Sequence, residues 1–129
     1  MDSLLKFTNF LLEHGYNLIE QNDKLKITKY EKKGLFIKIV QDVDSERYID
    51  ISRVNNHNWE GWSDMGIIYF FILKIPFEKG KAIGFELLSE FFMDHYNEIS
   101  DAYNQVNFPD TQLALAALED QRATILFGR

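Results

Sequence analysis

A chain of 129 residues, 46% of them hydrophobic, is long enough to bury the core of a single domain, which we place at residues 1–129. It contains no cysteine, which excludes a disulfide framework, a thiolate zinc site and a thiol nucleophile. Its net charge of −6 argues against nucleic acid or an anionic membrane surface as a partner.

The N-terminal residues do not resemble a secretory signal, because Asp2 is acidic and no sustained apolar run follows it. The most apolar stretch, residues 65–73, is much shorter than the roughly 20 residues that span a bilayer. We therefore expect a cytoplasmic protein.

The first half of the chain predicts a helix followed by a β-meander. Asp2 or Ser3 is a suitable cap for a first helix, and Gly15 is a suitable stop. Alternating apolar residues and short polar turns then predict about four antiparallel strands, at residues 17–21, 24–30, 35–40 and 48–54. One face of this sheet should be buried.

The next segment, residues 63–73, is compatible with either a strand or a buried helix, because it is rich in β-branched and aromatic side chains. We favour the helix, since Ser63 and Asp64 suit its start and Ser63 can cap it. Pro76 and Gly80 should end this element.

Two further helices are expected in the last third. The apolar periodicity of residues 81–106 predicts one long helix, and Asp110 should cap a final helix over residues 111–125. The predicted fold is therefore α+β: an N-terminal helix, an antiparallel meander, then two to three helices packed on the sheet.

Acidic residues are concentrated in this last third. Residues 82–121 carry eight of them and no lysine or arginine, whereas residues 1–81 are balanced. Five follow the helical repeat along one side of the long helix: Glu86, Glu90, Asp94, Glu98 and Asp101. Like charges one turn apart repel by about 0.2–0.5 kcal/mol per pair. We interpret this acidic ridge as a docking surface for a basic protein, with a merely solvated face as the alternative.

The sequence offers no recognisable catalytic or metal-binding motif. The histidines His14, His57 and His95 come from separate segments, and no nucleophile elbow, phosphate-binding loop or zinc motif occurs. We therefore expect a protein that is not an enzyme, with no catalytic residues, no cofactor and no metal ion.

Two other features invite interpretation. The polar loop before residue 63 contains two tryptophans: we expect Trp62 to fill the core between sheet and helices, whereas Trp59 suits either the core or a partner contact and joins the candidate partner-binding residues. The early strands are rich in lysine, which we expect to be solvated on the sheet surface: Lys24, Lys26, Lys29, Lys32, Lys33 and Lys38.

The predicted elements follow one another in a definite order. An N-terminal helix and a short-turn meander come first, then an apolar helix that starts at Trp62-Ser63-Asp64-Met65, and then a helix that contains Leu87-Leu88-Ser89-Glu90-Phe91-Phe92. This order of elements resembles small bacterial immunity proteins encoded beside polymorphic or contact-dependent toxins. The resemblance implies a protein that binds and neutralises a cognate toxin, often a basic nuclease. An acidic ridge suits that role because it would compete with the phosphates that a nuclease binds.

Two alternatives remain. The chain fits an acidic adaptor or regulatory protein unrelated to toxins, and it also fits a small ligand-binding or hydrolytic domain that uses His57, Trp59 and Glu60. The sequence leaves the identity of the partner and the oligomeric state open.

Overall fold

The computed structural model describes residues 2–75 and 83–127. The elements up to the sheet's last strand are α1 (Ser3–Glu13), β1 (Asn17–Asn22), β2 (Ile27–Lys32), β3 (Leu35–Gln41), β4 (Arg47–Ser52) and β5 (Ser63–Asp64). The helices that follow are α2 (Met65–Leu73), α3 (Phe85–Asp94), α4 (Tyr96–Ala102) and α5 (Phe108–Phe127). This order confirms the predicted α+β class.

The strands form an antiparallel meander in the order β1-β2-β3-β4-β5, so the predicted meander is confirmed. Strand β5 is an addition of two residues that pairs with β4 at the edge of the sheet. The loop between β2 and β3 consists of Lys33 and Gly34, which have φ values of 50° and 78°. Positive φ at both positions is what a two-residue hairpin loop requires.

Strand β2 begins at Ile27, three residues later than the sequence predicted. The side chain of Asn22 accepts a hydrogen bond from the backbone N–H of Leu25 at 3.0 Å, and this contact stabilises a turn before the strand. As a consequence Leu25, which falls within the predicted strand at residues 24–30, precedes β2 and is 60% exposed.

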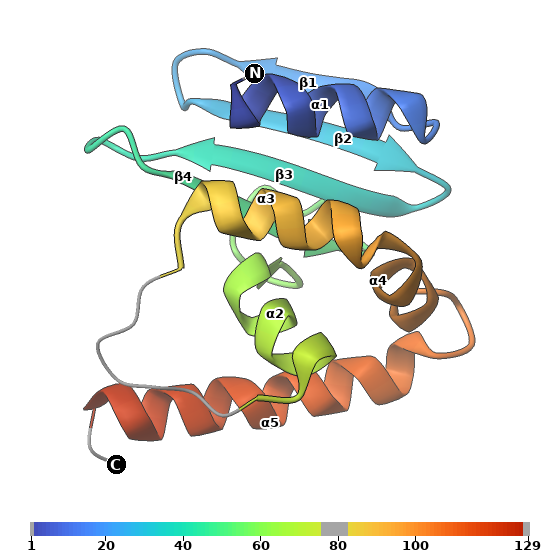
Figure 1. Cartoon of the computed structure of the whole chain (residues 1–129), viewed down its shortest axis with the longest axis vertical. Helices are drawn as coiled ribbons and strands as arrows, with labels where there is room; N and C mark the ends of the chain where they lie inside the picture. The colour runs from blue at the N-terminus through green and yellow to red at the C-terminus, as the bar shows by residue number, and fades with distance from the viewer. Residues whose placement is uncertain (1, 76–82, 128–129) are drawn as a thin grey trace.

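One face of the sheet is covered by α1 and α3, which lie side by side across it (Figure 1). The rings of Phe7 on α1 and Phe92 on α3 meet edge to face, with centroids 5.3 Å apart. Beneath them the alternate residues of the two central strands are buried, namely Ile37, Ile39, Ile49 and Ile51. Each such side chain contributes about 1.5–3 kcal/mol by leaving water.

The predicted helix after the sheet is confirmed as α2, and it runs between α3 and α5 (Figure 1). Its cap is Asp64, whose side chain accepts from the N–H of Ile67 at 3.0 Å. Ser63, the cap expected from the sequence, is instead part of β5, where it pairs with Ile51 of β4. The helix ends at Leu73, before Lys74 in the left-handed conformation; the predicted stops at Pro76 and Gly80 lie outside the described residues.

The single long helix predicted over residues 81–106 is wrong. Lys81 lies outside the described residues, and from Phe85 onward the segment is divided between α3 and α4 at His95, whose φ and ψ are −113° and 24°. In Figure 1 α4 turns away from the line of α3. The backbone bonds from His95 N–H to Phe91 and from Ile99 N–H to His95 persist, so the chain bends without losing them.

The helical segment also ends earlier than predicted, at Ala102, and Val106 is 85% exposed. The side chain of Asn107 donates to the carbonyl of Asp101 at 2.9 Å, and Asn104 accepts from the N–H of Asn107 at 2.7 Å. These side-chain amides replace the hydrogen bonds that a continuing helix would make.

The last helix begins at Phe108 rather than at residue 111, so Asp110 lies in its first turn and is not its cap. Pro109 is tolerated there because the first turn of a helix leaves its N–H groups without intrahelical partners. The hydroxyl of Thr111 donates to the carbonyl of Ala102 at 2.7 Å and holds α5 to the end of α4.

Candidate functional site

Three of the five predicted ridge residues form an acidic row on α3. Glu86, Glu90 and Asp94 are each exposed and stand four residues apart in one continuous helix. Their carboxylates make no ion pair with another residue in the ranges 2–75 and 83–127. The opposite side of α3 is buried against the sheet and α1 through Leu88 and Phe92. We call these three residues the α3 acidic row.

The other two ridge residues belong to α4, so the ridge is not the single straight line that the sequence predicted. Glu98 is exposed but accepts a 2.7 Å hydrogen bond at Oε1 from His95 Nδ1 when that nitrogen carries a proton. Asp101 is exposed as well, and its backbone carbonyl takes part in the turn after α4. Because of the bend at His95, these two carboxylates do not continue the line of the α3 acidic row.

Trp59 is presented by a compact loop between β4 and β5. The indole N–H of Trp62 donates to the carbonyl of Asn56 at 3.1 Å, and the side chain of Asn56 donates to the carbonyl of Glu60 at 2.8 Å. Gly61 has a φ of 81°, and a Cβ there would lie 2.7 Å from a methyl carbon of Val54. The loop thus holds Trp59 with 80% of its surface exposed.

The loop does not place Trp62 where the sequence predicted. Trp62 lies outside the hydrophobic cluster between sheet and helices. Its ring lies on the opposite face of the sheet, 4.3 Å from Lys38 Nζ and 5.5 Å from Lys29 Nζ. Because Ile37 and Ile39 point into the core, strand alternation sends Lys38 to this outer face.

Charged side chains cross the outer face from one edge of the sheet to the other. Strand register brings one charged residue from each strand into line, and we call these five the charge row: Glu20, Lys29, Lys38, Asp50 and Asp64. Lys29 Nζ lies 3.4 Å from Glu20 Oε1, and Lys38 Nζ lies 3.7 Å from Asp50 Oδ2. Lys29 also donates to the side chain of Asn55 at 2.8 Å.

The two lysines of the charge row are poorly solvated, which corrects the expectation that they lie exposed on the sheet surface. Lys29 and Lys38 are only 3% and 9% exposed, because Trp62 and the loop cover them. Burial lowers the pKa of Lys38, and the neighbouring Asp50 partly opposes that shift. Burial raises the pKa of Asp50 to about 6; the Lys38 ammonium lowers it and the Asp64 carboxylate raises it further.

The last member of the charge row connects the sheet to α5. Both oxygens of Asp64 accept from Arg122, at 3.0 and 2.7 Å, in a bidentate pair that links residues 58 positions apart. Sequence reasoning missed this pair, since nothing in local spacing predicts which residue of α5 meets the edge of the sheet. The available signal for the charge row was the alternation of Lys38 and Asp50 with the isoleucines of β3 and β4.

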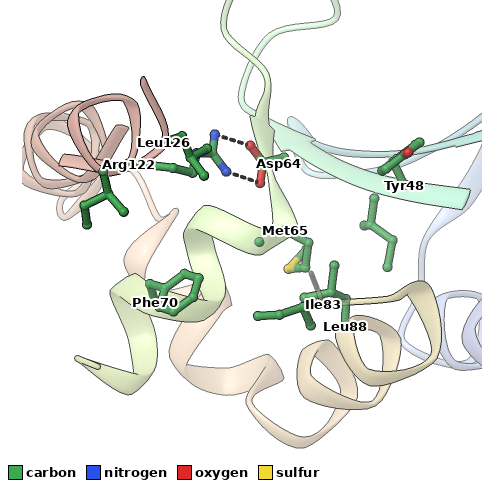
Figure 2. Close-up of a pocket in the computed structure, with 11 residues that line it drawn as sticks. Tyr48, Asp64, Met65, Phe70, Ile83, Leu88, Arg122 and Leu126 are labelled. Atoms are coloured by element: carbon green, nitrogen blue, oxygen red, sulfur yellow. Dashed lines mark hydrogen bonds and ion pairs between the residues drawn. The ribbon is translucent and has the colours of Figure 1, made fainter. Parts of the chain in front are cut away.

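The Asp64–Arg122 pair borders a pocket of about 410 Å³ between the sheet edge, α2, α3 and α5 (Figure 2). In Figure 2 the ion pair lies at one end of this pocket, and Ile83 and Leu88 lie at the other. Most of its lining is apolar, and its carboxylate and guanidinium are already paired with each other. Such a pocket suits an apolar side chain better than acid–base chemistry.

A second pocket, of about 380 Å³, lies between the Trp59 loop, the residue that follows α4, and helix α5. Trp59 and Trp62 line it together with Tyr103 and Phe108. His57 and Glu60 are exposed and line none of the pockets described, so the loop contributes only Trp59 of the three residues proposed for ligand binding. None of the five ridge residues lines this pocket either.

Comparison with known proteins found no matching family model, no matching curated protein and no matching solved structure. Among the described residues no three histidine, aspartate or glutamate side chains are grouped closely enough to hold a metal ion. No helix in those same ranges has both the length and the apolar character needed to cross a membrane.

Proposed function

We propose that this chain is a protein-binding module that docks a basic partner through the α3 acidic row. The observation that supports this proposal is the row itself: three exposed carboxylates, one turn apart, without an ion pair to any described residue. Such a row lowers helix stability, since neighbouring like charges repel. It also creates a negative potential that would speed encounter with a positively charged surface.

The partner that best fits this surface is a toxin domain with a basic active-site cleft, and the chain would then act as its immunity protein. The resemblance to immunity proteins in the order of elements supports this assignment. Carboxylates of Glu86, Glu90 and Asp94 would occupy the positions of substrate phosphates and so block the cleft. Glu98 and Asp101, on the bent helix α4, would contact the edge of the same partner.

The test uses the protein as bait in lysate of its native host, beside two charge-reversed variants. Glu90→Lys alters the centre of the α3 acidic row, and Glu13→Lys makes the same change of charge on an exposed residue of α1. We expect a basic protein to be retained by the parent and by Glu13→Lys, and to be lost from Glu90→Lys. Expressed alone, that protein should arrest growth, and co-expression of this chain should relieve the arrest.

The outcomes separate the candidate functions. A basic partner that has no effect on growth would support the acidic adaptor instead of the immunity protein. Equal capture by the parent and Glu90→Lys would exclude the α3 acidic row as the docking surface.

A further inference from the structure

The pocket beside Trp59 has aromatic walls from three parts of the fold. Trp59 and Trp62 come from the loop before β5, Tyr103 follows α4, and Phe108 begins α5. The rings of Tyr103 and Phe108 have centroids 5.3 Å apart and are tilted by 34°. Trp59 is 80% exposed, so its ring offers an open face at the mouth of this pocket.

One carboxylate on the pocket wall lacks an ion pair. Glu119 makes none with any residue in the described ranges, although Arg122 is close enough to affect it. Arg122 directs both terminal nitrogens to Asp64. Partial burial raises the pKa of Glu119; Arg122 lowers it, while Asp64 and Asp120 raise it further. Arg122 also lines this pocket, but its charge is matched by Asp64 in the bidentate pair, so Glu119 leaves the pocket wall with an unmatched negative charge that would favour a cation.

The pocket also contains an unused polar atom. The hydroxyl oxygen of Tyr103 is buried and has no hydrogen-bond partner among the described residues. Burial raises the pKa of Tyr103, and the nearby Ser63 hydroxyl, which makes no well-aligned hydrogen bond with it, lowers that pKa by less; the Tyr103 hydroxyl therefore stays neutral and can both donate and accept. A buried hydroxyl without a partner is uncommon, and it leaves a donor and an acceptor that a water molecule or a ligand group can complete.

We propose that this pocket receives an arginine side chain of the basic partner. A guanidinium is planar, so it can stack on Trp59 while its N–H groups donate to Glu119 and to the hydroxyl of Tyr103. The chain already uses a neighbouring ring in this way, since Lys38 Nζ lies 4.3 Å from the centroid of Trp62. The proposal rests on the proposed function only in that the partner supplies the arginine.

The test needs no partner. The indole N–H resonances of Trp59 and Trp62 are followed by NMR while n-butylguanidinium chloride is added, with n-butylurea as the neutral planar control and n-butylammonium as the lysine mimic. We expect saturable shifts with n-butylguanidinium, weaker ones with n-butylammonium and none with n-butylurea. Glu119→Gln and Trp59→Ala should each weaken binding at least about fivefold, as expected when a charge-assisted or stacking contact is lost.

Glu13→Gln is the matched control, because it removes an exposed carboxylate that belongs neither to the pocket nor to the α3 acidic row, and its binding should equal that of the parent. No saturable shift, equal binding of the urea and the guanidinium, or an unchanged Glu119→Gln would overturn the proposal. Preference for n-butylammonium would overturn the arginine assignment. Because the α3 acidic row plays no part in this titration, either proposal can fail while the other stands.

Discussion

The surroundings of Asp50 strongly change the ionisation of its carboxyl group. It lies between Lys38 on β3 and Asp64 on β5, on the outer face of the sheet. Its ion pair with Lys38 does not offset the cost of burial, and the pKa of Asp50 rises to about 6 from an ordinary value of 3.8. Folding therefore favours the protonated carboxyl, and this preference is lost as the pH rises.

This shift predicts a pH dependence that Asp50→Asn should remove. The folded pKa lies above the unfolded one, so the stability contribution is complete below about pH 4 and disappears as the pH passes 6. Relative to the variant, the parent should lose up to about 3 kcal/mol between pH 4 and 7. Urea unfolding of both proteins across this range is the measurement, and parallel stability curves would show that Asp50 titrates normally.

The buried hydroxyl of Tyr103 leads to a second prediction, which concerns stability. Removing its hydroxyl with Tyr103→Phe removes a buried group that has no hydrogen-bond partner among the described residues, so the free energy of unfolding should rise by about 1 kcal/mol. Tyr16→Phe is the matched control, because the Tyr16 hydroxyl accepts from Tyr96 at 3.2 Å. That variant should lose about 0.5–1.5 kcal/mol. A loss of stability in Tyr103→Phe would mean that its hydroxyl is satisfied.

Among the elements, α3 combines a buried apolar side with the α3 acidic row. Because the helix is continuous from Phe85 to Asp94, Glu90 has a like charge one turn away on each side. The bend at His95 takes Glu98 out of this regular spacing, and Glu98 contacts His95 instead. The electrostatic cost of the row therefore falls on α3.

Glu90→Gln should make the protein more stable, since it removes two repulsive pairs while retaining size and helix propensity. The expected gain is roughly 0.4–1 kcal/mol at low salt, at about 0.2–0.5 kcal/mol per pair. It should shrink as salt is added, and Glu90→Lys should gain more than Glu90→Gln. Urea melts at two salt concentrations measure this. A loss of stability in both variants would place Glu90 in contacts that the exposed helix face does not show.

For the whole molecule, the sequence predicted what depends on local pattern. The isoleucines of β3 and β4 alternate, so the buried face of the sheet was correctly predicted, and the apolar segment after Asp64 was correctly predicted as a helix. The division at His95 escaped prediction because the apolar period of 3.6 residues continues through it. The end at Ala102 depends on the side chains of Asn104 and Asn107, which no periodicity reveals.

In the candidate sites, too, local sequence pattern predicted some features and missed those that depend on tertiary packing. The exposure of Glu86, Glu90 and Asp94 followed from their position on the helix, and it is seen in the structure. The covering of Lys29 and Lys38 by Trp62, and the pairing of Asp64 with Arg122, depend on segments far apart in the chain. Such contacts are set by tertiary packing and leave no signal in residue spacing.

The central claim is that the α3 acidic row docks a basic partner. Its most direct test is to measure, at two salt concentrations, the rate at which the captured partner associates with the parent, with Glu90→Lys and with Glu13→Lys. Electrostatic steering predicts a rate for the parent that falls steeply as salt rises. Glu90→Lys should associate more slowly and depend less on salt, whereas Glu13→Lys should stay close to the parent. A rate that does not depend on salt, or a Glu90→Lys protein that binds as fast and as tightly as the parent, would contradict the claim.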